Sequence, residues 1–155
     1  MKKLKSFLFA KTNPSSPLFH FGLFVLRVFV GMTMALAHGW NKIPPSEKFL
    51  EGVIEMGFPL PIVFAWSAGL AEFMGGILLA IGLFVRPSAL FIAITMGVAG
   101  FVRHAEDPFQ KQELSLVYLA VAIFFVCVGG GKWSIDSKVR THFWDTPSPK
   151  SVSVP

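Results

Sequence analysis

Residues 18–37 read LFHFGLFVLRVFVGMTMALA, an apolar run that only His20 and Arg27 interrupt. Its 20 residues are the length that an α-helix needs to cross the hydrocarbon core of a bilayer. Only 15% of the 155 residues are charged and the mean hydropathy is +0.60, which argues against a water-soluble domain. We therefore expect an all-α integral membrane protein with a bundle of four transmembrane helices. The expected spans are residues 18–38, 61–85, 88–103 and 114–130.

The segments outside these spans divide the chain into one membrane domain and two tails. Residues 1–17 are basic and end in a run of Pro, Asn and Ser that does not continue a helix, so they are expected to form a tail. The membrane domain covers 18–138, and residues 139–155 are expected to form a flexible tail. Between the first two spans, Ser46 is placed to cap a short amphipathic helix, which we expect on the membrane surface.

The distribution of Lys and Arg predicts the orientation in the membrane. Nine of them lie before the first span, in the turn after the second span and after the fourth span, whereas four lie in the two loops on the other side. Cytoplasmic loops carry the excess of basic residues, so both termini are expected in the cytoplasm. The first group is Lys2, Lys3, Lys5, Lys11, Arg86, Lys132, Lys138, Arg140 and Lys150, and the second is Lys42, Lys48, Arg103 and Lys111.

Charge and cysteine content exclude two further classes of protein. The net charge is +5 and the pI about 9.6, but the basic residues are scattered around apolar runs, so nucleic acid is not an expected partner. Cys127 is the only cysteine, so the chain has no intrachain disulfide, no CxxC motif and no cysteine-based zinc site. Sulfur redox chemistry would require a partner protein or a substrate thiol.

Two ionisable residues, Arg27 and Glu72, lie inside the expected spans, where a charge costs at least about 3 kcal/mol. Each is 11 residues from the expected outer end of its helix, about 16 Å deep, so we expect the two side chains to pair. The pair is either a buried structural contact or part of a ligand site, and the sequence leaves both open. Both residues lie on stripes of small residues that permit close helix contact. The stripes are Arg27, Gly31 and Ala35, and Ala68, Glu72, Gly76 and Ala80.

Further polar groups are expected around the outer mouth of the bundle, above Arg27 and Glu72. His38 lies on the same helix face as Arg27, and Tyr118 lies below the outer end of the fourth span. Together these groups predict a cavity that opens to the extracytoplasmic side. The candidate ligand-binding residues are His38, Glu72, Arg27, His104, Arg103, Glu113, Tyr118, Trp40 and Lys42.

Each of these residues also has an ordinary explanation. Arg103, His104 and Glu113 are typical interfacial residues at helix ends, Lys42 is typical of a solvated loop, and Tyr118 of helix packing. His38, His104 and Glu113 have ligand types suited to a metal, but they lie on separate helices without a local motif, so no metal site is predicted.

Five short motifs in a fixed order resemble the DoxX family of small four-helix membrane proteins. They follow the first span, lie within and at the end of the second, and follow the third and fourth, so the resemblance covers about residues 18–138. The motifs are His38-Gly39-Trp40-Asn41-Lys42, Ala71-Glu72-Phe73-Met74-Gly75-Gly76, Gly82-Leu83-Phe84-Val85-Arg86, Pro108-Phe109 and Gly131-Lys132-Trp133-Ser134-Ile135-Asp136.

The resemblance implies a multi-pass protein of the bacterial inner membrane. It also implies a likeness to the membrane subunit of thiosulfate:quinone oxidoreductase, with quinone as the ligand of a cavity formed by His38, Glu72 and His104. The chain has no flavin or haem motif and no cysteine pair, so a separate redox subunit would complete electron transfer. Catalysis by the chain alone is not predicted, and no cofactor is expected to be intrinsic to it.

Two hypotheses about function follow from the sequence. The first is a membrane subunit of a quinone-linked or thiol- and sulfur-related redox system with an outward-facing polar cavity. The alternative is a non-enzymatic membrane scaffold or a protein that binds or transports a small molecule. Under either, the lipid bilayer surrounds the protein, and the small-residue stripes permit a homo-oligomer as well as packing within the chain.

Overall fold

The computed structural model describes residues 13–143, and helices are the only regular secondary structure within them. Four helices have the length and apolar composition of membrane spans. They cover Pro17–Lys42, Pro61–Ile81, Val85–Arg103 and Phe109–Val128. Together with the apolar composition, they confirm the predicted all-α, four-span membrane protein, whose surroundings are a lipid bilayer.

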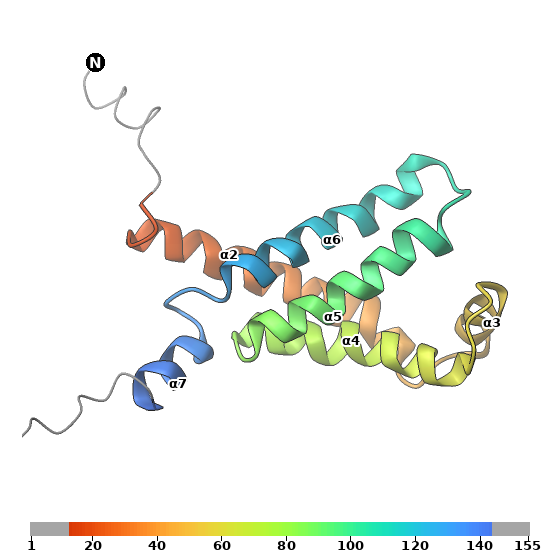
Figure 1. The fold of residues 1–155 in the computed structure, drawn as a ribbon, viewed down its shortest axis with the longest axis horizontal. Coiled ribbons are helices and arrows are strands. Elements are labelled where there is room, and N and C mark those ends of the chain that lie inside the picture. The colour runs from red at the N-terminus through yellow and green to blue at the C-terminus, as the bar shows by residue number, and fades with distance from the viewer. Residues whose placement is uncertain (1–12, 144–155) are drawn as a thin grey trace, which may run out of the picture.

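The spans run back and forth along one axis, and each packs on the next in the sequence (Figure 1). The first consists of α2 (Pro17–Thr33), the π-helical η1 (Met34–Gly39) and the 3-10 turn η2 (Trp40–Lys42). It is followed by α3 (Glu47–Glu55) and α4 (Pro61–Ile81). After these come α5 (Val85–Val98), the π-helical η3 (Ala99–Arg103), α6 (Phe109–Val128) and α7 (Ile135–Phe143).

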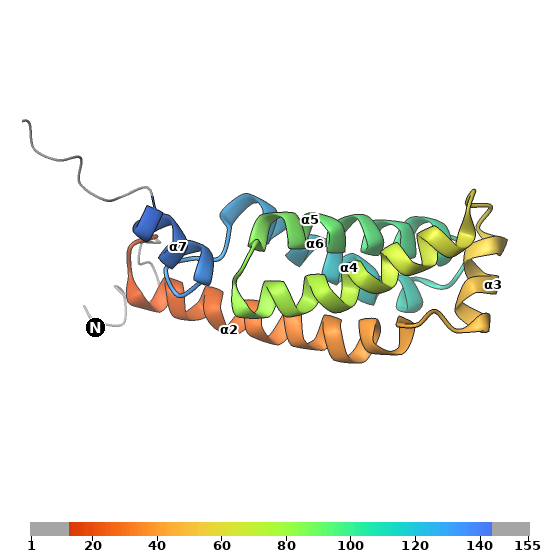
Figure 2. The same cartoon turned by 90° about the horizontal axis from the view of Figure 1, so that it is seen from below.

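The two ends of the molecule carry different short helices. Figure 2 shows α3 at one end and α7 at the other, beside the start of α2. An even number of spans brings both ends of the described chain to the same side, as the predicted topology requires. We call the end with α7 the inner end and the end with α3 the outer end, following the orientation that the basic residues predict.

Local sequence explains where the helices begin. The Ser16 hydroxyl accepts a hydrogen bond from the Phe19 backbone N–H at 3.1 Å, and Pro17 occupies the first turn of α2. Ser46 caps α3 in the same way, accepting from the Phe49 N–H at 3.3 Å, so the predicted cap is confirmed. Pro61 begins α4.

Close contact between α2 and α4 depends on the predicted small residues. A Cβ atom at Gly31 would lie 2.6 Å from the Ala80 nitrogen and from the Gly76 carbonyl oxygen, so only glycine fits there. This contact confirms that the two stripes face each other. The core beneath it is apolar and includes Leu23, Val30, Met34, Leu79, Ile92, Met96, Ala122 and Phe125.

Several predicted boundaries were wrong by a few residues. The first span continues past residue 38, because π-helical and 3-10 turns extend it to Lys42. The second span ends at Ile81 instead of 85, because Gly82 adopts the left-handed conformation (φ +81°) that ends a helix. The third begins at Val85, since Pro87 falls in its first turn, where a proline is tolerated.

The fourth span and the C-terminal tail also differ from the prediction. α6 begins at Phe109 instead of 114, because polar residues form its solvated first turn. α7 extends to Phe143, so the first five residues of the expected flexible tail are helical. Asp136 in its first turn and Arg140 in its last favour this short helix through the helix dipole. The remaining tail, and the N-terminal tail up to residue 12, lie outside the described residues.

Candidate functional site

A carboxylate is buried in the middle of α4. The Glu72 side chain is 1% exposed, and its two oxygens accept hydrogen bonds from the Lys42 Nζ atom at 2.6 and 2.7 Å. Lys42 is the last residue of η2 and its side chain is 27% exposed. The ion pair therefore joins the outer end of the first span to the interior of the second.

Two glycines allow η2 to reach this position. A Cβ atom at Gly69 would lie 2.8 Å from the Lys42 carbonyl oxygen, and a Cβ atom at Gly39 would collide with the Phe73 backbone. Both glycines are buried. The backbone around Lys42 thus lies directly on α4, which directs the lysine side chain to Glu72 and not to solvent.

The Lys42–Glu72 pair forms one wall of a large cavity at the outer end, which we call the outer groove. Its volume is about 760 Å³, in the range of small-molecule sites, and residues of α3, α4, α5 and η3 line it. Val63, Phe91 and Ile94 line it and are 53, 59 and 56% exposed. Because these exposed apolar side chains belong to membrane spans, the groove opens sideways toward lipid.

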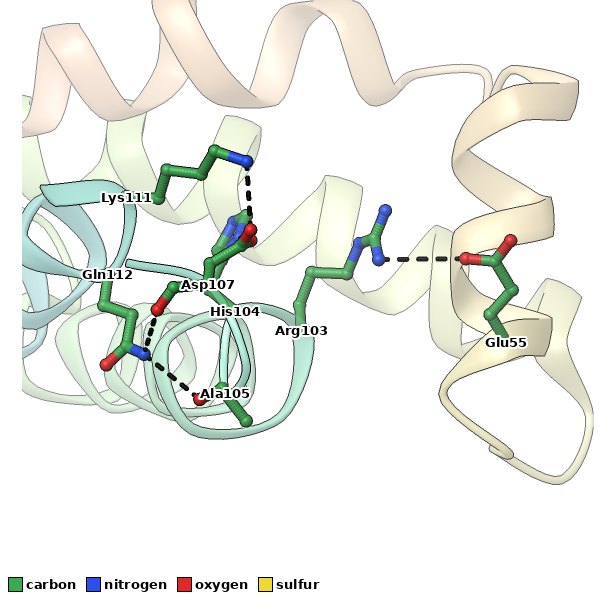
Figure 3. Close-up of polar contacts among 7 residues, drawn as sticks. All are labelled: Glu55, Arg103, His104, Ala105, Asp107, Lys111 and Gln112. Atoms are coloured by element: carbon green, nitrogen blue, oxygen red, sulfur yellow. Dashed lines mark hydrogen bonds and ion pairs between the residues drawn. The ribbon is translucent and has the colours of Figure 1, made fainter. Parts of the chain in front are cut away.

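The amphipathic helix α3 covers the outer part of the groove. Phe49 and Val53 of α3 line it, and the Phe49 ring lies 5.1 Å from the Lys42 Nζ atom. Figure 3 shows Arg103 of η3 extending to Glu55 of α3, with 3.7 Å between the charged atoms. Both side chains are more than half exposed, so this ion pair holds α3 against η3 only weakly.

A second polar cluster lies in the loop between η3 and α6. The Asp107 carboxylate is 2.7 Å from His104 Nδ1 and 2.9 Å from Lys111 Nζ (Figure 3). The hydrogen bond with His104, followed by that with Lys111, lowers the pKa of Asp107 below its ordinary value of 3.8. His104 lines the outer groove, so the cluster fixes one polar group at the groove's outer end.

His38 and Tyr118 form a separate contact. Their rings meet edge to face with centroids 5.2 Å apart, and both side chains are half-buried. Neither residue lines the outer groove. His38 precedes Gly39, at which a Cβ atom would lie 2.8 Å from the Glu72 backbone carbonyl carbon.

Arg27 lies away from the candidate site, and its predicted pairing with Glu72 was wrong. The Arg27 guanidinium donates hydrogen bonds to the carbonyl oxygens of Leu79 and Ala80 at 2.9 and 2.6 Å, and of Trp133 at 3.0 Å. Leu79 is seven residues beyond Glu72, about 10 Å toward the inner end. Glu72 pairs with Lys42 instead.

Asp136, which the sequence analysis did not single out, completes the inner end. Its carboxylate oxygens accept from the backbone N–H groups of Phe84 and Val85 at 2.8 and 2.9 Å, which caps α5. Its own N–H donates to the Gly82 carbonyl at 2.9 Å. Arg27 thus binds the last turn of α4 and Asp136 the start of α5, so the two residues hold the helix ends on either side of the connecting turn.

The remaining predicted residues are not brought into the outer groove. Glu113 is exposed, and Trp40 is 62% exposed with its ring against Phe73. Cys127 is exposed on α6 and does not line the groove either. The mouth predicted to open to the outside is in fact a groove that opens sideways, with Lys42, Glu72, Arg103 and His104 as its members from the predicted set.

Asp107, Lys111 and Glu55 were not among the candidate residues, although the sequence contains a signal for two of them. Asp107 is three residues after His104 and four before Lys111, and these spacings predict a local cluster around the carboxylate. The contact of Glu55 with Arg103 has no such signal, because it joins residues far apart in the sequence. No group of three or more His, Cys, Asp or Glu side chains among residues 13–143 is arranged to hold a metal ion.

The chemistry available in the groove is that of one buried acid–base pair in an apolar setting. The hydroxyls of Ser67 and Thr95 donate to carbonyl oxygens of their own helices at 2.7 and 3.0 Å. Both hydroxyls are therefore already bonded within their own helices. At the buried side of the groove, Lys42 supplies the hydrogen-bond donor and Glu72 the acceptor. A ligand with an apolar body and a polar head group matches this arrangement.

Comparison with known proteins agrees with these observations. The sequence model of the DoxX family matches residues 22–105. An uncharacterized protein of Haemophilus influenzae is 33% identical over 73% of this chain and 87% of its own length. The inner membrane protein YqjF of Escherichia coli is 29% identical over 74% of this chain and 89% of its own length. No solved structure matches the chain.

Proposed function

The chain belongs to the DoxX family, and from this premise we propose that it is an inner-membrane protein whose outer groove binds an amphiphilic ligand, a quinone, as the membrane subunit of a redox system. One observation carries the proposal: the Lys42–Glu72 ion pair lies at the buried side of a groove of about 760 Å³ that opens toward lipid. The inner-membrane location is supported by the four spans and by the name of the E. coli relative.

The lining of the outer groove fits a quinone head group. Phe49 and Phe91 offer aromatic surface to a flat ring. The Lys42 ammonium has three N–H donors, and Glu72 accepts from it at 2.6 and 2.7 Å, so the remaining donor would serve a ring carbonyl. At the outer end, Arg103 and His104 supply two further donors.

A bound quinone supplies two-electron, two-proton redox chemistry. The chain's own contribution is to position the head group with Lys42, whose ammonium the Glu72 carboxylate holds in place, and to keep water away with the apolar walls of α4 and α5. Because Cys127 is the only thiol, the electrons would come from a partner protein.

A binding experiment with the full-length protein tests the proposal. A short-chain ubiquinone analogue is titrated into protein in mild detergent, and tryptophan fluorescence reports binding. We expect saturable binding that weakens at least about tenfold in Lys42→Met, which removes the donor to the ring carbonyl, and in Glu72→Gln, which removes the charge that holds the Lys42 ammonium in place. His38→Ala is expected to have a smaller effect, since His38 does not line the groove.

Glu113→Gln is the matched control. It removes a carboxylate on the outer side of the protein that does not line the groove, so its affinity should stay within about twofold of the wild type. Unchanged affinity in both Glu72→Gln and Lys42→Met would show that the quinone does not bind in the outer groove.

One observation favours the alternative of a non-enzymatic binding or transport protein. The groove is lined by exposed apolar side chains along α4 and α5, and such a wall accepts a lipid as readily as an isoprenoid chain. This function would be favoured if lipid co-purified with the wild type and could be displaced from it. In the same sample, no quinone would bind and no redox protein would co-purify.

A further inference from the structure

A second cavity lies at the inner end of the protein, opposite the outer groove. It has a volume of about 610 Å³, and we call it the inner cavity. Its walls come from the start of α2, the turn between α4 and α5, the glycine segment 129–131 and α7. None of its lining residues belongs to the outer groove, so its role is independent of the proposed quinone site.

The inner cavity carries an excess of positive charge. Arg86, Lys132 and Arg140 line it, against one carboxylate, Asp136, whose two oxygens already cap α5. Within residues 13–143, the side chains of Lys132 and Arg140 make no hydrogen bond or ion pair. Arg86 uses one of its five donors, on the Cys127 carbonyl at 3.2 Å.

Neutral donors without partners line the same cavity. The backbone N–H groups of Gly130 and Gly131 donate to no atom of residues 13–143. His20 is 8% exposed, and its Nε2 atom is buried without a hydrogen-bond partner in the described part of the chain. Its Nδ1 atom accepts from the Lys132 N–H at 3.4 Å, which assigns the proton of a neutral ring to Nε2.

We propose that the inner cavity binds a phosphate group, with Lys132, Arg140 and Arg86 as its cationic ligands. Unpaired cations together with free backbone N–H groups form a site for a multivalent oxyanion. Phe84 lines the cavity and Trp133 lies between its lining residues Lys132 and Ser134. The two aromatic residues are 61 and 49% exposed and are of a kind enriched at the membrane–water interface. The cavity therefore lies at the level of lipid head groups, where basic pockets on the cytoplasmic side bind anionic lipids.

Lipid titration of the full-length protein in mild detergent tests this site, with native mass spectrometry to count bound lipids. We expect phosphatidylglycerol to bind more tightly than phosphatidylcholine. Lys132→Gln should lower the affinity for phosphatidylglycerol about fivefold, and the double variant Lys132→Gln, Arg140→Gln at least about tenfold. Both side chains are exposed and make no bonds within residues 13–143, so both variants are expected to fold.

Lys138→Gln is the matched control, since Lys138 is exposed on α7, the helix of Arg140, but does not line the cavity. It should change the affinity less than about twofold. An equal loss in Lys132→Gln and Lys138→Gln would overturn the proposal, because it would show a general attraction between basic residues and anionic lipid. Equal binding of the two lipids by the wild type, with no binding of free phosphate, would also overturn it.

A second arm separates the two sources of phosphate. Inorganic phosphate and glycerol 3-phosphate are titrated into protein in phosphatidylcholine nanodiscs, with the thermal midpoint as the readout. A Lys132-dependent rise in the midpoint with soluble phosphate alone would support the site and assign it to a free anion. A response to phosphatidylglycerol alone would assign it to a lipid. Absence of both responses contradicts the proposal.

Discussion

The inner and outer ends of the protein each hold one fully buried ionisable side chain, but the partners differ in kind. Arg27 at the inner end binds three backbone carbonyls. The Arg27 guanidinium also occupies the space that a Cβ atom at Gly82 would need. Glu72 at the outer end binds one side chain, Lys42, beside a cavity of about 760 Å³. Both residues are 0% exposed, so burial alone does not distinguish structure from function.

The kind of partner distinguishes the structural residue from the candidate functional one. Backbone carbonyls at the end of α4 keep their positions as long as the helix exists, so the contacts of Arg27 hold the turn between α4 and α5 in place. A lysine side chain has several rotatable bonds and is able to exchange one acceptor for another. The outer pair is therefore the place where a ligand is able to share the donors of the lysine, and the inner contacts are structural.

Arg27→Met is expected to have the largest effect. It leaves carbonyl oxygens of Leu79, Ala80 and Trp133 without their shared donor, which should lower the free energy of unfolding by about 3 kcal/mol or more. Unfolding in SDS, followed by circular dichroism, measures this loss. Arg27→Lys keeps the positive charge but lacks the planar guanidinium. Its free energy of unfolding should therefore lie between those of the wild type and Arg27→Met. Wild-type stability in Arg27→Met would contradict the structural role.

Asp136→Asn should have the next largest effect, and on stability alone. An asparagine has one acceptor oxygen for the two N–H groups of Phe84 and Val85, so the cap of α5 weakens by about 1 to 2 kcal/mol. The same SDS titration measures it. Quinone affinity is expected to stay unchanged, because Asp136 does not line the outer groove. A change in quinone affinity without a change in the free energy of unfolding would contradict the structural role of Asp136.

Glu72→Gln is expected to show the opposite pattern. Ligand affinity should fall at least about tenfold, or about 1.4 kcal/mol, while the free energy of unfolding changes by less than about 1 kcal/mol since the amide retains an acceptor for Lys42. Titration of the quinone analogue and SDS unfolding of the same sample measure both. If Glu72→Gln lost as much stability as Arg27→Met, Glu72 would be a structural residue too.

The smallest effect concerns pH and the exposed cluster of the outer end. Hydrogen bonds from His104 and Lys111 lower the pKa of Asp107, so the folded state holds the charged form more strongly than the unfolded state does. The stabilisation is complete above the ordinary pKa of 3.8 and is lost as the pH falls through the lowered value in the folded protein. Thermal midpoints of wild type and Asp107→Asn, measured from neutral to acidic pH, should therefore converge in acid. Parallel curves would show that the cluster adds no stability.

Much of the architecture was predictable because it depends on local properties of the chain. The four spans follow from the length of the apolar runs, the start of α3 from Ser46, and the contact of α2 with α4 from the small residues at Gly31 and Gly76. Within the site, Glu72, Lys42, Arg103 and His104 were candidates, and all four line the outer groove. Each carries a polar group in or next to an apolar run, which is a signal that the sequence displays directly.

The partners of these residues were not predictable in the same way. The expected Arg27–Glu72 pair assumed that the first helix ended at His38, which placed Arg27 and Glu72 at equal depth. The helical path continues to Lys42, so Arg27 lies four residues, about 6 Å, farther from the outer end of its span than expected. This shift brings Arg27 to the end of α4 and Lys42 to Glu72.

By itself, the sequence determined the class of the protein, its number of spans and the kinds of polar groups near its ends. These depend on the free energy of transferring residues between water and lipid, which is a property of each residue and its neighbours in the chain. The tertiary structure alone decided which groups meet, because an axial shift or rotation of one helix changes every contact it makes with another. The assignment of Arg27 to structure and of Glu72 to a candidate site therefore depends on helix register.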